Sequence, residues 1–291
     1  MTTLEQIAYL ELPNIIKKKQ LKWPRNKGQR KTLHNKILRA ADSFELIYRK
    51  AVDKWFKIID TQAKGALGRI KKEEWDEYED DIDWEFLTIE GLLIFELLNT
   101  RLYEEGAKTA ARFAGTRTAG KFPVFDTWAK RDAGRLVTNV SNGVRENIKN
   151  AAIAAREHGI TIENMVRRIR PGLPVLPSSF NRIQRQYFEK LADGMTTSMA
   201  DRWRTRELTK MRNYRATLIS RTEAANTMVN SNLIWYGQTG IARVMWSVSP
   251  GACPLCDPHN GEIYNVYEAI GLIPLHPNGM CTWIPLAPGE V

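Results

Sequence analysis

Three cysteines and one histidine near the end of the sequence have the spacing of a zinc site. Cys253 and Cys256 form a Cys-x-x-Cys pair, and four residues separate His276 from Cys281. A Cys-x-x-Cys turn curls the backbone so that two thiolates meet one ion, and structural zinc takes four N or S ligands in a tetrahedron. We therefore expect one structural Zn²⁺, held by these four residues, to organise an otherwise coreless tail.

Other interpretations of this cluster stay open at this point. His259, three residues after Cys256, is an alternative ligand. The three thiols would otherwise be small buried apolar groups. A redox dithiol is less well supported, because Cys-Pro-Leu-Cys does not open a helix after a buried strand. The chain holds three cysteines in all, an odd and clustered number that favours a metal over disulfides.

Catalytic motifs are missing from the sequence. It contains no Gly-rich phosphate loop, no Gly-x-Ser-x-Gly and no His-Glu-x-x-His. Some His-Asn-His endonucleases hold zinc with cysteine pairs beside a histidine that activates water, but here His276 would have to be ligand and base at once. Glu223 has no second catalytic group beside it and is interpreted as structural. We expect a protein that is not an enzyme.

The net charge of +10 comes from one N-terminal segment. Ten basic residues and no acid lie between Lys17 and Arg39, and the rest of the chain is neutral overall. Because residues 17–31 also contain Trp23, Pro24 and Gly28, they disfavour a continuous helix or strand. We expect a flexible or extended basic arm there.

A second basic region covers residues 167–221, with thirteen Lys or Arg against four acids. Both regions suit phosphates, whose charge they would neutralise without reading bases, in a salt-sensitive manner. The arm would serve equally well against an acidic protein surface. The candidate nucleic-acid-binding residues are Lys17, Lys18, Lys19, Lys22, Arg25, Lys27, Arg30 and Lys31 in the arm, and Arg202, Arg204, Arg206, Lys210 and Arg212 in the second region.

Apolar residues at three-to-four spacing predict long helices through most of the chain. Ser178 or Ser179 is the expected cap of the fourth one. The acidic block 73–85 is interpreted as a solvated helix face, because Asp76, Asp80 and Asp83 lack the spacing of a calcium loop. The predicted helices cover residues 33–67, 86–102, 127–158, 183–191 and 199–236.

The C-terminal region changes to a strand pattern. Residues 242–249 alternate, Asn260–Gly261 is a hairpin-type turn, and residues 263–266 are the expected partner strand. The prolines within 170–179 mark the best internal boundary. We therefore predict a mainly α fold, with long helices and a small C-terminal α+β zinc-knuckle subdomain. Its segments are the arm 1–40, a helical domain 41–170, a basic helical segment 178–240 and the zinc-binding subdomain 241–291.

Targeting signals are also missing from the sequence. No apolar run reaches the length of a membrane span, and the first residues do not read as a secretory signal. We expect a soluble protein that folds in a cytoplasm and has no membrane partner.

Several motifs in the last third occur in a specific order: Ser220-Arg-Thr-Glu-Ala-Ala-Asn226, Trp235-Tyr-Gly-Gln-Thr-Gly240, Val244-Met-Trp246, Cys253-Pro-Leu-Cys256, Asn260-Gly261 and Pro274-Leu-His-Pro-Asn278 with Cys281. This combination, over residues 180 to 286, resembles the Mu F-like phage head morphogenesis proteins. The resemblance implies a minor head protein that binds the portal vertex of a procapsid, enters in a few copies and contacts packaged DNA nonspecifically. Its implied partners are the portal protein, a scaffold or major capsid protein and phage DNA. The implied location is the virion or procapsid interior, reached from the host cytoplasm during assembly.

The sequence departs from that family at two places. The family tail usually reads His-Pro-Asn-Cys-Arg-Cys, whereas Gly279 and Met280 precede Cys281 here. The acidic residue upstream of the first cysteine is replaced by Ser249-Pro-Gly251. The alternatives to a head protein active in morphogenesis and DNA packaging or ejection are a zinc-containing nuclease and a zinc-dependent nucleic-acid-binding regulator.

Overall fold

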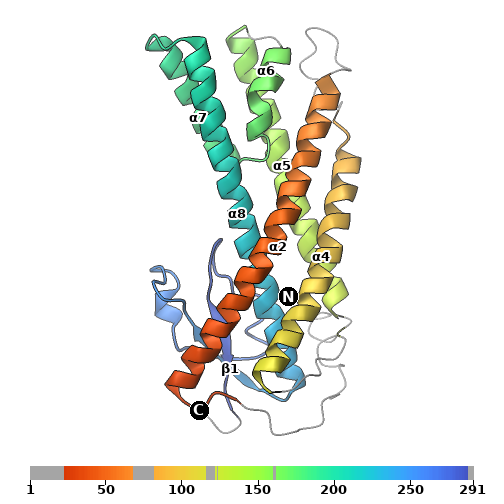
Figure 1. Cartoon of the computed structure of the whole chain (residues 1–291), viewed down its shortest axis with the longest axis vertical. Helices are drawn as coiled ribbons and strands as arrows, with labels where there is room; N and C mark the ends of the chain where they lie inside the picture. The colour runs from red at the N-terminus through yellow and green to blue at the C-terminus, as the bar shows by residue number, and fades with distance from the viewer. Residues whose placement is uncertain (1–22, 68–81, 116–121, 123, 160–161, 288–291) are drawn as a thin grey trace. The chain divides into compact units, whose positions relative to one another are not determined.

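The computed structural model describes residues 23–67, 82–115, 122, 124–159 and 162–287 (Figure 1). Within them it is mainly helical with one small sheet near the C-terminus, which confirms the predicted fold class. The α-helices are α2 (Lys27–Leu67), α4 (Trp84–Phe113), α5 (Val124–Glu157), α6 (Ile162–Ile169), α7 (Pro177–Ala192) and α8 (Thr197–Gln238). The strands are β1 (Arg243–Ser247), β2 (Ile263–Asn265) and β3 (Thr282–Pro285). No described helix is long and apolar enough to cross a membrane.

Helix α2 begins at Lys27, six residues before the predicted start. The amide oxygen of Asn26 accepts the Gln29 N–H at 2.9 Å, and the Gln29 side chain accepts the Arg25 N–H at 2.8 Å. This reciprocal cap satisfies two backbone donors and lets the helix include Gly28. The prediction of an irregular arm is therefore wrong for residues 27–31. Its lysines at positions 17, 18, 19 and 22 lie outside the described residues.

The first turns of α7 and α4 are capped in different ways. Helix α7 begins with Pro177 at its first position, after an extended Leu176, and neither Ser178 nor Ser179 caps it. The predicted serine cap is wrong, because proline has no N–H that needs a partner at that position. Asp83 caps α4 by accepting the Phe86 N–H at 2.8 Å. The rest of the acidic block up to residue 81, with Asp76 and Asp80, lies outside the described residues.

The chain forms two compact units, each assembled from segments that are distant in sequence. Unit 1 contains residues 1–49, 96–131 and 218–291, and unit 2 contains residues 50–95 and 132–217. Helices α2, α4, α5 and α8 each contribute to both units. The predicted segments 1–40, 41–170, 178–240 and 241–291 divide the sequence in another way and stay predictions.

In unit 2, the proline-rich stretch forms a turn whose carbonyl groups are bound by two buried side chains. Asn147 donates to the carbonyl oxygens of Leu173 at 3.0 Å and Val175 at 2.8 Å. Arg215 donates to those of Pro174 at 2.8 Å and Val175 at 2.9 Å. Buried carbonyls without partners are costly, so these two side chains stabilise a segment that no regular helix can include.

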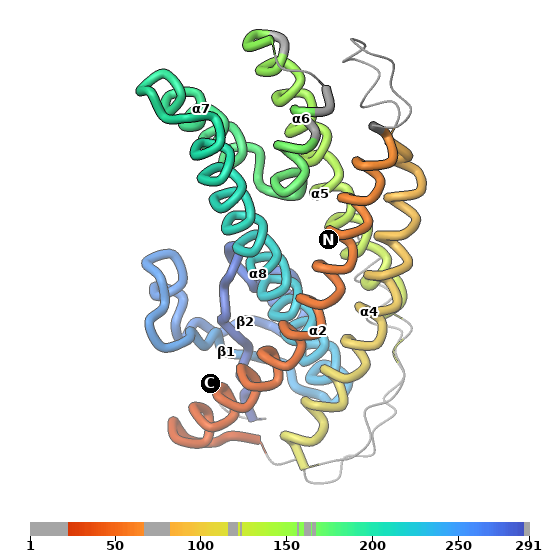
Figure 2. The backbone as a smooth tube through the Cα atoms, turned by 45° about the horizontal axis from the view of Figure 1, so that its top comes forward, coloured from red at the N-terminus to blue at the C-terminus, as the bar shows by residue number. Residues whose placement is uncertain are grey.

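In unit 1, the three strands form an antiparallel sheet in the order β2-β1-β3. Val244 pairs with Tyr264 across the predicted hairpin, which confirms it, and Trp246 pairs with Trp283 on the other side. Strand β3 was not predicted, because all four of its residues are buried and no alternation is visible. Figure 2 shows β1 and β2 beside the last part of α8.

The C-terminal tail contributes to a hydrophobic core that it shares with the helices of unit 1. Trp235 of α8, Trp246 and Trp283 are almost fully buried in one hydrophobic cluster that also includes residues of α4 and α5. Trp23 packs against this cluster, with its ring centroid 5.6 Å from that of Trp235. The expectation of a coreless tail is therefore wrong.

Candidate metal centre

The predicted ligands lie on two loops that flank the central strand. Cys253 and Cys256 belong to the loop between β1 and β2, and His276 precedes β3. The N–H groups of Cys256 and Asp257 both donate to the Cys253 carbonyl at 3.0 Å, which curls the Cys-x-x-Cys turn. This turn brings the two thiols to the same side of the loop.

Three of the predicted ligand atoms meet at one point. The His276 Nε2 atom lies 3.1 Å from the Cys253 sulfur and 3.2 Å from the Cys256 sulfur. All three atoms lie within 4.8 Å of one another. Tetrahedral zinc would hold a sulfur and a nitrogen ~3.6 Å apart, so a small expansion accommodates an ion. The group formed by Cys253, Cys256 and His276 can hold a metal ion.

The histidine ring is oriented for this role by its second nitrogen. Nδ1 of His276 lies 2.8 Å from the carbonyl oxygen of Pro277, which can only accept a hydrogen bond. This contact assigns the proton to Nδ1 and leaves the lone pair of Nε2 directed at the two sulfurs. A backbone carbonyl in this position is a common partner of metal-binding histidines.

The two thiols of the turn differ in acidity. Backbone N–H groups of Cys256 and Leu255 point at the Cys253 sulfur and lower the pKa of this thiol to about 7. Burial, reinforced by the neighbouring Cys281 thiol, raises the pKa of Cys256 to about 12. A cation between the ligands would compensate for burying the second thiolate.

The other two predicted ligands are placed differently. Cys281 is buried next to Cys256 but is not part of the group of three. The alternative ligand His259 bonds through Nδ1 to Glu262 at 2.7 Å, and its ring stacks on Trp246 with centroids 4.7 Å apart. The structure therefore does not bring His259 to the cluster.

The loop that carries His276 is bonded to α8, and through Arg221 to α2, by residues that sequence reasoning did not assign to the site. Arg221 of α8 donates to the Asn278 side chain at 3.1 Å and pairs with Glu45 of α2 at 3.0 Å. Asn278, at a φ of 69°, donates its N–H to the Thr222 hydroxyl at 2.9 Å. The Ser-Arg-Thr motif was the available signal, but its partner was not visible in the sequence.

The candidate nucleic-acid-binding residues of α8 separate into two groups. Arg204 is 2% exposed, lies 3.9 Å from the centre of the Tyr187 ring and bonds to Asp201. Arg212 pairs with Asp60 at 2.6 Å. Both arginines are engaged by residues of unit 2, so these contacts give no support to the prediction that they bind phosphate, which stays a prediction.

The other three candidate residues of α8 are exposed. Arg202, Arg206 and Lys210 are spaced four residues apart, so they form one basic stripe along α8. At the start of α2, Arg25, Lys27 and Lys31 are exposed and Arg30 is half-buried.

Comparison with known proteins identifies no relative. No protein-family model matches the sequence, and no curated protein or solved structure is significantly similar to it.

The contact of Arg221 with Asn278 leads to a testable prediction about metal affinity. Arg221→Met should weaken Co²⁺ binding by up to about ten-fold, the lower end of the effect of direct partners of ligands, because Arg221 reaches His276 only through Asn278. The measurement is titration of cobalt–thiolate absorption, with far-UV circular dichroism to show that the helices are intact. Arg206→Met, at an exposed position of the same helix, is the matched control. Equal affinities of the two variants would contradict the role of Arg221.

Proposed function

We propose that this chain is a minor head protein of a tailed phage, whose C-terminal module is held by a structural zinc ion. The observation that carries the proposal is the spatial convergence of the motifs on which the family resemblance depends. Arg221 and Thr222 from the first motif contact Asn278 from the last, and His276 meets the Cys-x-x-Cys pair. Motifs that occur together in a sequence are readily explained if their residues come together in one site.

Zinc is the metal that these ligands favour. Two thiolates and an imidazole are soft and borderline donors, and structural zinc sites commonly combine three cysteines with one histidine. Cys281 is the proposed fourth ligand, since its thiol already lies beside that of Cys256. Closing a ~20-residue loop costs only a few kcal/mol, whereas zinc contributes about 10 kcal/mol or more at neutral pH.

A structural role fits this site better than catalysis. In the proposed site both nitrogens of His276 are used, one by the metal and the other by the Pro277 carbonyl. A nuclease would need a histidine that is free to activate water, and His259 is paired with Glu262. The proposal therefore assigns no catalytic residue to the chain.

The proposed partners are the portal protein, a scaffold or major capsid protein and DNA, in the interior of the procapsid or virion. The basic stripe of Arg202, Arg206 and Lys210 supports nonspecific contact with phosphates, because its side chains are exposed on one helix face. The exposed cations at the start of α2 would add to this contact.

The zinc proposal is tested by elemental analysis of purified protein. We expect about one zinc per chain, lost in Cys253→Ser and reduced in Cys281→Ser, because a structural site needs its four ligands. His259→Asn is the matched control and should keep the metal. Full zinc content in Cys281→Ser together with loss of zinc in His259→Asn would identify His259, not Cys281, as the fourth ligand. Absence of zinc from the unmodified protein would contradict the proposal.

The stripe is tested by salt-dependent binding to random-sequence duplex DNA. Replacing Arg202, Arg206 and Lys210 together by glutamine should reduce the slope of log K against log salt by about 2 to 3, roughly one for each lost phosphate contact. The control replaces the exposed Lys50, Lys54 and Lys57 of α2 by glutamine, which removes the same number of positive charges outside the stripe. Equal losses in both triple variants would mean that net charge alone drives binding.

The assembly role is tested with the portal protein encoded in the same genome. The two proteins, expressed together, should elute as one complex in size-exclusion chromatography, and the chain should be detected in purified procapsids by mass spectrometry. Absence from both fractions, with a coding region distant from portal and capsid genes, would contradict the head-protein assignment.

A further inference from the structure

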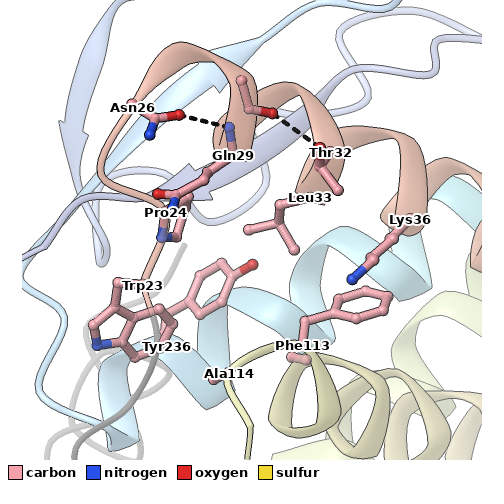
Figure 3. A pocket seen from close by; sticks show the side chains of 12 residues that line it. Trp23, Pro24, Asn26, Gln29, Thr32, Leu33, Lys36, Phe113, Ala114 and Tyr236 are labelled. Carbon is pink, nitrogen blue, oxygen red and sulfur yellow. Dashed lines mark hydrogen bonds between the residues drawn. The ribbon is translucent and has the colours of Figure 1, made fainter.

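Unit 1 contains a pocket of about 470 Å³ that no part of the proposed function uses. It lies between the start of α2, the end of α4 and the end of α8 (Figure 3). Its volume is within the range of small-molecule sites, about 300 to 1,000 Å³. The residues that define its chemistry are Trp23, Lys36, Phe113 and Tyr236, with Asn26 and Gln29 at the α2 end.

The walls of the pocket are aromatic and apolar. The Trp23 ring is held with its centroid 6.0 Å from that of Tyr236, and Phe113 and Leu33 line the other side. Alanines 110 and 114 complete the α4 wall. Such walls favour a flat or branched apolar group over a strongly hydrated one.

The polar groups of the pocket are mostly hydrogen-bond donors. The side-chain oxygens of Asn26 and Gln29 already accept the capping bonds of α2, so their NH₂ groups remain as donors. Lys36 forms no ion pair with any carboxylate that the structure describes, and its ammonium lies 5.9 Å from the centre of the Phe113 ring. No acidic side chain belongs to the described lining.

Tyr236 supplies a second hydrogen-bond donor to the pocket, independent of Lys36. Its side chain is 1% exposed, and its hydroxyl is a buried polar atom with no hydrogen-bond partner in the described part of the chain. Burial raises the pKa of Tyr236, so the hydroxyl stays protonated and can donate. Figure 3 shows this hydroxyl directed into the space beside Leu33, between the Trp23 and Phe113 side chains. A buried donor without an acceptor is costly.

We propose that this pocket binds a monocarboxylate whose apolar group has about the size of a leucine or phenylalanine side chain. The carboxylate would accept from Lys36 and Tyr236, and the apolar group would lie against Trp23 and Phe113. One cation without a counter-ion matches a single negative charge, and a carboxylate supplies acceptors only. The ligand is either a free acid or the C-terminal residue of a peptide, and the inference does not depend on the proposed function.

The test compares N-acetyl-phenylalanine with N-acetyl-phenylalaninamide, titrated into the full chain by isothermal calorimetry. These compounds have the same apolar group and differ in the carboxylate. The acid should bind with a Kd of about 1 mM or below, as expected for a ligand of this size, and the amide at least about ten-fold more weakly. Equal binding of the two compounds, or no binding of the acid at 10 times that concentration, would overturn the proposal.

Variants assign the preference to the pocket. Lys36→Met should reduce the affinity for the acid to that for the amide, whereas Lys31→Met, an exposed lysine on the same helix outside the pocket, should change nothing. Tyr236→Phe should lower the affinity for the acid several-fold. The melting temperature of the free protein should stay unchanged or rise, because the variant removes a buried donor without a partner. A preference for the acid that survives Lys36→Met would overturn the proposal.

The source of the carboxylate is distinguished by two further titrations. One uses 3-phenylpropionate, and the other uses N-acetyl-Gly-Gly-Phe with a free C-terminus. Tighter binding of the peptide would identify a peptide end as the occupant, and tighter binding of the small acid would identify a free acid. If neither binds more tightly than its own amide, the pocket does not recognise a carboxylate and the proposal fails.

Discussion

One guanidinium group, that of Arg221, connects the loop that carries His276 to two helices. It bonds to Glu45 on α2 and to Asn278 in the loop that carries His276, so it joins two helices and this loop inside unit 1. The ion pair itself is partly exposed, with side-chain exposures of 37% and 19%, and such pairs contribute about 1 kcal/mol or less. Its importance is therefore geometric. Through Asn278 it constrains the loop in which His276 faces the two cysteines, and ligand geometry decides whether a metal can be held.

Local signals in the sequence were sufficient for the hairpin, for three of the four expected ligands and for all described α-helices except α6 (Ile162–Ile169), which was not predicted. The three-to-four spacing of apolar residues depends only on helix geometry, and an Asn-Gly turn on backbone conformation, so both can be read without knowledge of the fold. The Cys-x-x-Cys pair is equally local. The start of α2 was missed because its cap depends on Asn26 and Gln29 acting together in a segment dominated by lysine, tryptophan and proline.

The features that could not be predicted are contacts between distant residues. Arg221 and Glu45 are 176 positions apart, and Arg212 and Asp60 are 152 apart. A count of basic residues treats Arg204 and Arg206 alike, yet one is buried over the Tyr187 ring and the other is exposed, because the helix turns by about 100° per residue and only one face is covered. Strand β3 depends on burial from both sides and leaves no alternation in the sequence.

The hydrophobic core around Trp235, Trp246 and Trp283 limits what a bound metal would do in this protein. A sheet of three strands, each three to five residues long, is marginal by itself. Here the sheet shares its core with α4, α5 and α8 through Trp235, Trp246 and Trp283, so burial of aromatic surface stabilises the strands without an ion. Cys256 and Cys281 are buried members of this core, Cys253 packs against it, and His276 is half-buried in the loop before β3. A bound metal would therefore order the loops and set their shape, while the helices and the sheet keep their fold through packing.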